Sequence, residues 1–310
     1  MAVPDWPTTY GYNMFLFPIS KWVGGIFYEH SHRLVASGVG FLTMILAGWL
    51  WLKEERRWLR WLGVAALVGV CVQGVLGGLR VTLFKAELGI FHAVLAQLFL
   101  LLMTLIALFL SARWQQLSQQ SEKARFHPLF RPLVLGSTLL ILVQLALGAS
   151  MRHQHAGLAI PDFPLAYGKA WPDTSPAALE AANLSRHDYR EFSPITAGQI
   201  HLHMAHRITA GLILLLVGAV AICARKGENV PWVAKLSLAW LGLILAQAFL
   251  GAYTVWSNKA ADVATAHVAC GAVSLVAGGM IYALASALAA PASVRTRTTS
   301  FVAKGAPALG

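Results

Sequence analysis

Four histidines recur at matched positions in the two halves of the sequence, each near one end of a long apolar run. They are His32 and His92 in the first half, and His206 and His267 in the second. The copies are offset by 174 residues at one position and 175 at the other. Ionisable groups at membrane depth are costly and usually mark function. A single histidine would most simply hydrogen-bond a neighbouring helix, but two repeated pairs favour ligands to a shared group.

These pairs suit axial ligation of a haem iron, with one imidazole from each of two facing helices. Small residues nearby would let a flat ring approach the helix backbones: Gly38, Gly40, Gly77, Gly78, Gly211, Gly251 and Ala252. Zinc is a weaker alternative, because structural zinc takes four clustered nitrogen or sulfur ligands. The three cysteines, Cys71, Cys223 and Cys270, lie inside predicted helices and do not gather into such a cluster with the histidines. We assign none of the other seven histidines to iron.

A carboxylate distinguishes the two halves. Glu29 stands three residues before His32, on the same helix face, where the second half carries His203. A proton-handling group in one copy alone predicts different roles, with one haem reacted upon and the other relaying electrons. The alternative is an acidic residue favoured by the positive end of the helix dipole.

An arginine directly follows one histidine of each pair, Arg33 in the first half and Arg207 in the second. Both point away from the ligand direction, so we expect them to reach anions such as haem propionates. Alternatively, Arg33 pairs with Glu29 at the i, i+4 spacing, and the two roles can coexist.

The elements that must position these groups are membrane helices. The 310 residues are 57% hydrophobic and 12% charged, with a mean hydropathy of +0.61, which indicates a polytopic membrane protein. A span of the hydrocarbon core takes roughly 20 helical residues. Seven runs satisfy that length: 29–52, 59–79, 88–112, 132–151, 200–224, 233–256 and 263–289.

The net charge of +11 reflects topology and does not predict a nucleic-acid partner. Basic residues gather in alternate segments, at 53–60, 113–131, 225–235 and 295–304. By the positive-inside rule these segments, including the C-terminal tail, are cytoplasmic. The haem sites therefore fall toward the outer face of the membrane.

An internal repeat organises the chain. "AVPDWPTTYG" at 2–11 returns as "AIPDFPLAYG" at 159–168, and "HRLVASG" at 32–38 returns as "HRITAGL" at 206–212. Both copies enter the membrane from the same side, which predicts a parallel repeat. Each proline-rich loop is expected to cover a haem edge as a lid, with a purely structural turn as the alternative.

The predicted fold is all-α, with two pseudo-symmetric four-helix bundles and seven helices, because the first helix of the first bundle is missing. We expect the chain to begin within a longer reading frame, and loss of the helix is the alternative. The predicted parts are a first half at 1–112, a cytoplasmic linker at 113–131, a second half at 132–290 and a tail at 291–310.

The ordered motifs "PDWPTTYG", "EHSHR", "LGIFH", "GLAIPDFPLAYG", "HMAHR" and "TAH" resemble the haem A synthase family. The resemblance implies an enzyme that oxidises the C8 methyl of haem O to a formyl group, making haem A for terminal oxidases. It implies that His32 and His92 bind haem O, that His206 and His267 bind haem b, and that Glu29 is the catalytic carboxylate. The cysteine pair that many members carry in their outer loops is absent here.

The implied setting is the bacterial inner membrane, with haem O synthase and an electron-donor protein as partners. A dihaem b-type electron carrier is the alternative function and would use the same four histidines. Their common depth argues against it, because such a carrier would stack its haems across the bilayer. A transporter is a third alternative, but it would need broken helices at the midplane, and matching glycine or proline interruptions are not seen there.

Overall fold

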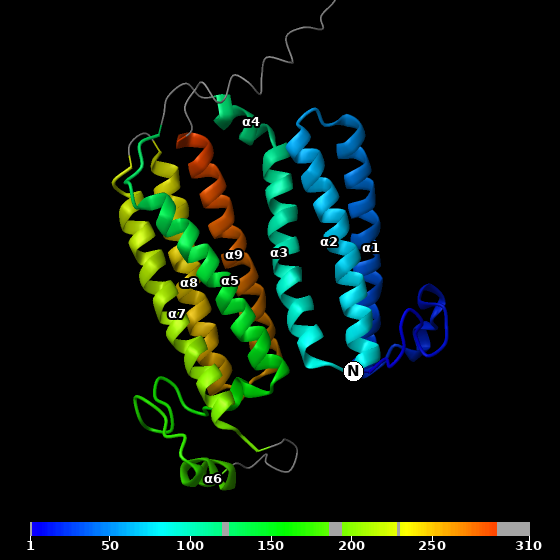
Figure 1. Cartoon of the computed structure of the whole chain (residues 1–310), viewed down its shortest axis with the longest axis vertical. Coiled ribbons are helices and arrows are strands. Elements are labelled where there is room, and N and C mark those ends of the chain that lie inside the picture. Colours follow the sequence, from blue (N-terminus) through cyan, green and yellow to red (C-terminus); the bar gives the residue numbers. More distant parts are fainter. Residues whose placement is uncertain (1, 120–123, 186–193, 228–229, 290–310) are drawn as a thin grey trace, which may run out of the picture. The chain divides into compact units, whose positions relative to one another are not determined.

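The computed structural model describes residues 2–119, 124–185, 194–227 and 230–289, and within them seven helices are long and apolar enough to cross a membrane (Figure 1). They are α1 (Gly24–Lys53), α2 (Arg57–Leu83), α3 (Ala86–Leu110), α5 (Phe130–His153), α7 (Ala197–Ala224), α8 (Pro231–Trp256) and α9 (Ala261–Ala289). A helix satisfies every backbone polar group internally, which the hydrocarbon requires. The prediction of an all-α polytopic membrane protein with seven spans is confirmed.

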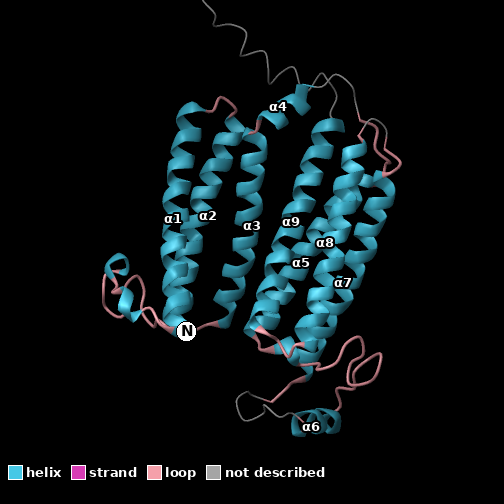
Figure 2. Cartoon of the chain, turned by 180° about the vertical axis from the view of Figure 1, so that it is seen from behind, coloured by secondary structure: helices cyan, strands magenta, loops and turns pink. Residues whose placement is uncertain are grey.

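The spans begin before their predicted starts, and two short helices were not predicted. The spans begin two to five residues earlier than predicted, and in α2, α3, α5, α7 and α9 the added residues include a charged or amide side chain, which lowers their hydropathy. The short helices are α4 (Ala112–Gln119) and α6 (Pro176–Leu184). The third span ends at Leu110, two residues before its predicted end, because the Ser111 hydroxyl accepts from the Trp114 amide and α4 begins. Three 3-10 turns complete the described elements (Figure 2): η1 (Met14–Leu16), η2 (Ile19–Lys21) and η3 (Ala156–Leu158).

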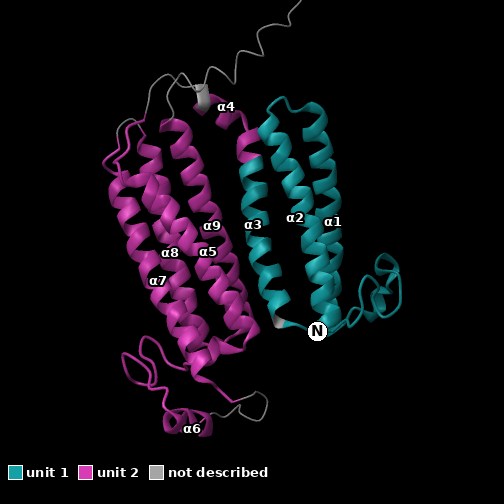
Figure 3. Cartoon of the chain, viewed as in Figure 1, with its two compact units in different colours: residues 1–106 teal, residues 107–310 magenta. Residues whose placement is uncertain are grey.

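The chain divides into two compact units, residues 1–106 and 107–310 (Figure 3). In the first unit α1 packs against α2, and α3 meets α2 through side chains such as Phe99 against Gly69. In the second unit α5, α7, α8 and α9 form a closed ring of four helices, each packed on two neighbours. The short helix α4 also belongs to this unit and packs against α9. The more detailed boundaries expected from the sequence stay a prediction, and the tail at 291–310 lies outside the described residues.

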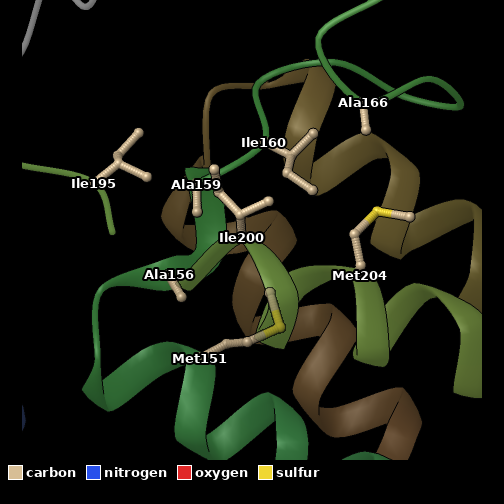
Figure 4. Close-up of a cluster of buried hydrophobic side chains, with 8 residues drawn as sticks. All are labelled: Met151, Ala156, Ala159, Ile160, Ala166, Ile195, Ile200 and Met204. Carbon is tan, nitrogen blue, oxygen red and sulfur yellow. The ribbon is translucent and has the colours of Figure 1, made fainter. Parts of the chain in front are cut away.

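The second unit is held together at two levels. In the interior, the Trp240 indole N–H donates to the Ser274 carbonyl at 2.9 Å, and the ring packs against Gly278 of α9. At the end where α5 leads into η3, a buried apolar cluster joins the loop to the helices (Figure 4): Met151, Ala156, Ala159, Ile160, Ala166, Ile195, Ile200 and Met204. The cluster joins the loop that follows α5 to the first turns of α7, where Met204 lies two residues before His206.

Candidate functional site

Each unit holds two of the four histidines as a facing pair. His32 of α1 and His92 of α3 have ring centres 6.5 Å apart and planes inclined by 70°. His206 of α7 and His267 of α9 have ring centres 6.4 Å apart and planes inclined by 67°. A metal–imidazole bond of about 2 Å, with about 1 Å from nitrogen to ring centre, separates the ring centres of opposed ligands by about 6 Å. Both pairs have the separation that one iron between the rings requires.

Glycines make room for the imidazoles. A β-carbon at Gly77 would lie 3.2 Å from His92 Cε1, and one at Gly251 would lie 3.1 Å from His267 Cε1. Both distances are tighter than ordinary side-chain contacts. The sequence predicts that these glycines let a haem ring approach, whereas in the structure their neighbour is the imidazole itself. Helix α2 and its counterpart α8 therefore leave space for the histidine of the following helix.

Helix α5 supports His206 in the same way. A β-carbon at Gly148 would lie 3.3 Å from His206 Cε1, and the Gln144 side-chain amide donates to the His206 carbonyl at 3.0 Å. Neither residue was singled out in the sequence. The signal that could have indicated them is a glutamine and a glycine one helical turn apart on the apolar helix that precedes the "AIPDFP" loop.

The donor set fits a metal carried by a macrocycle. The Nδ1 atoms of His92, His206 and His267 are buried and make no hydrogen bond in the structure, which is costly unless another partner is supplied. The rings of His92 and His267 also interact with the backbones of Gln73 and Gln247 on the adjacent helix. Within the described residues no three His, Cys, Asp or Glu side chains cluster, so the zinc alternative gains no support there. A haem needs only two axial nitrogens.

In the first unit, Arg33 binds the backbone of the loop that precedes α1. Its Nη1 donates to the carbonyls of Asp5 at 2.8 Å and Thr8 at 2.9 Å, and its Nη2 donates to Val3 at 3.3 Å. The side chain is 9% exposed. Arg33 therefore fastens the PDWP loop to the first turns of the helix that carries His32.

Arg207 does the same in the second unit. Its guanidinium donates to the carbonyls of Asp162 at 2.6 Å and Leu165 at 2.8 Å, and it lies 5.3 Å from the centre of the Phe163 ring. Its Nε is buried without a partner. The predicted contact of both arginines with haem propionates stays a prediction, because what the structure shows is their contact with the loops.

Each loop contains the same tight turn. The Tyr-Gly dipeptides at 10–11 and 167–168 have φ between 50° and 76°, as the two central residues of a type I′ turn require. The carboxylate of Asp5 accepts from the Tyr10 and Gly11 amides, and Asp162 accepts from the matching amides of the second loop, at 2.7–2.9 Å. These bonds compensate for the left-handed backbone of a tyrosine. The structural turn is therefore present, and the lid role stays a prediction.

The Asp5 carboxyl lies outside the membrane spans and has a shifted pKa. Burial raises this pKa, but the hydrogen bonds from Gly11, Thr8 and Tyr10 together lower it by a larger amount. The pKa therefore lies below its usual value of 3.8. The carboxylate is consequently ionised at neutral pH and holds the turn as an anion.

Glu29 lies beside this loop and is held on both carboxylate oxygens. Its Oε1 lies 3.2 Å from Arg33 Nη2, and its Oε2 accepts from the Ala2 and Val3 amides at 2.8 and 3.2 Å. The predicted i, i+4 ion pair is therefore present. At the matched position of the second unit, His203 is only 3% exposed and its Nδ1 has no hydrogen-bond partner. The halves differ at this position as the sequence indicated.

His30 has a structural contact that the sequence did not reveal. The side chain is fully buried, its Nδ1 lies 3.2 Å from the Thr9 hydroxyl, and its ring packs against Phe17 and Trp22. His32, two residues later, is exposed and faces His92. The loop therefore packs on His30, which leaves His32 as the ligand candidate.

The fold and the paired imidazoles define an integral membrane protein built from a repeated helical unit, with one histidine pair in each copy. Residues 3–278 match the COX15-CtaA family, described as cytochrome oxidase assembly protein. Because the match covers most of the chain, the chain belongs to this family.

Three curated proteins are similar to this chain. A protein named "Heme A synthase" from Geobacillus kaustophilus is 27% identical over 250 residues, covering 77% of this chain and 69% of that protein. The protein of the same name from Shewanella oneidensis is 24% identical, covering 86% and 82%. The one from Beijerinckia indica is 32% identical, covering 74% and 62%.

Proposed function

We propose that the chain is a haem A synthase that oxidises the C8 methyl group of haem O to a formyl group. The family match over residues 3–278 and the relatives named "Heme A synthase" support a haem-related substrate and cofactor. The product, haem A, would serve terminal oxidases, in keeping with the description of the family as cytochrome oxidase assembly proteins.

The observation that carries the proposal is an asymmetry within a repeat. The two histidine pairs agree to 0.1 Å in ring separation, and the two arginine-bound loops use the same turn. The first copy nevertheless carries a carboxylate, Glu29, at the position where the second copy carries His203. Two sites of the same geometry with one acidic group favour one reactive haem and one electron-relaying haem.

In this proposal His32 and His92 bind the iron of haem O, and His206 and His267 bind haem b. When bound, haem b supplies one-electron transfer to or from the substrate site. The chain holds the substrate between α1 and α3, because the two imidazoles lie on facing helices at one level. The arginines Arg33 and Arg207 keep the loops closed over the ends of these helices and are candidates for propionate binding.

Glu29 is the candidate catalytic group. Two successive hydroxylations, each a two-electron oxidation of the carbon, would convert the methyl group to a gem-diol, which loses water to give the aldehyde. The oxidant comes from outside the chain: dioxygen, reduced with electrons from the donor protein, or an electron acceptor that takes four electrons if water supplies the oxygen. A carboxylate beside the methyl group stabilises positive charge developing on that carbon or positions a water molecule. Arg33 and the amides of Ala2 and Val3 fix the direction in which its oxygens point. Positioning of this kind reduces the reorganisation that the reaction requires.

The proposed setting follows from the charge pattern. The histidine ends of the helices would face away from the cytoplasm, and the C-terminal tail would be cytoplasmic in a bacterial inner membrane. Haem O synthase and an electron-donor protein are the proposed partners. We also propose that the division expected from the sequence, a substrate half at 1–112 and a haem b half at 132–290, is the functional one.

The test is to produce the chain with a source of haem O and identify the extracted haems by mass. Formation of haem A by the parent chain, and its loss in Glu29→Gln with both haems still bound, is the expected result. Glu87→Gln is the matched control, because this exposed carboxylate lies in the first turn of α3. Bound haem with haem O unchanged in the parent would favour the dihaem electron carrier.

A further inference from the structure

The segment between the PDWP loop and α1, residues 12–23, folds with two distinct sides. On the inner side, Phe17 is 4% exposed and packs against Tyr10, Tyr12 and His30. Trp22 packs against the same His30 ring, and its indole N–H donates to the Phe17 carbonyl at 3.3 Å. The two turns η1 and η2 are therefore anchored to the first unit through aromatic contacts.

The same segment also exposes four large apolar side chains, which we call the apolar patch: Phe15, Leu16, Ile19 and Val23, exposed by 68%, 76%, 80% and 63%. Four such groups on one short, folded segment are unusual for a surface that faces water.

The apolar patch belongs to the segment that leads directly into the first turns of α1, and η1 contacts that helix. Figures 1 and 2 both show the N-terminal segment extending sideways from the lower end of α1. Phe27 and Tyr28, in the first turns of α1, are also exposed, by 46% and 73%. Aromatic side chains of this kind settle at the boundary between headgroups and acyl chains.

Charge also separates this segment from the corresponding loop of the second unit. Residues 12–23 contain one charged residue, Lys21, whose ammonium donates to the Tyr12 hydroxyl at 3.0 Å. Residues 169–196 contain seven charged residues. In the second unit, α6 lies beyond the ends of α5 and α7 and not beside them (Figure 1). Only the first loop combines low charge, exposed apolar groups and a position beside a spanning helix.

We propose that the apolar patch is a membrane-interface anchor, inserted among the lipids that surround the first turns of α1. The partner is the phospholipid bilayer itself, with Lys21 and the aromatic rings at headgroup level. Insertion would hold residues 12–23 against the helix and, through them, the adjoining loop that binds Glu29 and Arg33.

The experiment uses the full chain reconstituted in phosphatidylcholine vesicles that contain doxyl-labelled lipid. Single cysteines at Leu16 or Ile19, in a background lacking Cys71, Cys223 and Cys270, carry an environment-sensitive fluorophore. Ser175, the N-cap of α6, is the matched control on the loop of the second unit. We expect blue-shifted emission and quenching by doxyl lipid at least about threefold stronger at the two patch positions than at Ser175.

Two results would overturn the proposal. One is quenching of the patch labels by aqueous iodide to the same extent as the Ser175 label. The other is shielding from iodide without quenching by lipid, which would assign the patch to contact with a second copy of the chain.

The unlabelled chain gives a second measurement that does not depend on the cysteine variants. In vesicles, chymotrypsin should cut after Leu184, which is 77% exposed on the outer loop of the second unit, and spare Phe15 and Leu16. Equal cleavage at both loops would contradict insertion.

Discussion

Arg33 Nη2 lies 3.2 Å from Glu29 Oε1, one helical turn away on α1, while the same guanidinium binds three carbonyls of the preceding loop. This arrangement joins the candidate catalytic carboxylate to the loop. Glu29 is joined to it a second time through the Ala2 and Val3 amides. The loop and the carboxylate therefore form one hydrogen-bonded unit. A substitution in the loop should change the position of the carboxylate, and a substitution at Glu29 should loosen the loop.

Arg33→Lys should lower haem A formation by about tenfold while leaving haem binding intact, because hydrogen bonds from a charged donor contribute about 1.5–3 kcal/mol each and lysine cannot replace the guanidinium fork. The measurement is the ratio of haem A to total extracted haem. Arg152→Lys, at the exposed end of α5, is the control. An unchanged ratio in Arg33→Lys would show that the loop contacts do not position Glu29.

His267→Ala should abolish the low-spin absorption spectrum of the second haem, since one axial nitrogen is lost and the ring of His206 faces it at 6.4 Å. The chain should still bind haem O through the first unit, which contains its own pair. A low-spin spectrum that persists unchanged in both His267→Ala and His206→Ala would refute the ligand assignment for this unit.

Gly251→Ala should lower the haem content of the second unit, because its new β-carbon would lie 3.1 Å from His267 Cε1 and push the ring aside. Gly242→Ala on the same helix is a sharp control, since a β-carbon there meets nothing within 4 Å. Alanine in place of glycine favours a helix by about 1 kcal/mol, so the control should be at least as stable as the parent. The haem-to-protein ratio and the thermal unfolding temperature are measured for both variants. Equal haem content in the two variants would contradict the prediction.

Gly78→Ala should loosen the PDWP loop, because a β-carbon would lie 2.5–2.7 Å from three atoms of the Trp6 indole. The second copy of the repeat has the smaller Phe163 and the larger Ala252 at the matched positions. Trp6→Phe should therefore rescue Gly78→Ala. Limited proteolysis at Tyr10 reports the loop, with Gly74→Ala as the control on the same helix, where a β-carbon meets nothing within 4 Å. If the double variant is still cleaved faster than the parent, the effect of Gly78→Ala is not explained by the clash between the new β-carbon and the Trp6 ring.

The Tyr10–Gly11 turn should lose stability in acid. The pKa of Asp5 is lower in the folded chain than its usual value of 3.8, so its contribution to stability is complete above that value and is lost as the pH falls through the folded pKa. Hydrogen exchange of the Tyr10 and Gly11 amides, corrected for intrinsic rates, should accelerate below about pH 4. In Asp5→Asn the exchange should be fast throughout, and a pH-dependent step surviving in that variant would place its origin elsewhere.

Much of the architecture could be predicted from the sequence for a physical reason. A membrane span must be about 20 apolar residues long, so the seven spans were visible in hydropathy alone. The repeat of His32 as His206, and of His92 as His267, identified the pairs before any distance was known. The first residues of the spans and the short helices α4 and α6 were missed, because a hydropathy window does not detect helix ends or short helices.

The sequence by itself therefore determined the class of the protein, the pairing of its histidines and the asymmetry at Glu29, because these depend on composition, repetition and spacing along the chain. Only the tertiary structure decided that Gly77 and Gly251 lie against imidazoles, that Trp6 packs on Gly78, and that the two arginines hydrogen-bond the loops. Such contacts join segments far apart in the chain. They depend on how each helix is rotated about its axis and how closely it approaches its neighbour, which an almost uniformly apolar helix does not encode in its periodicity.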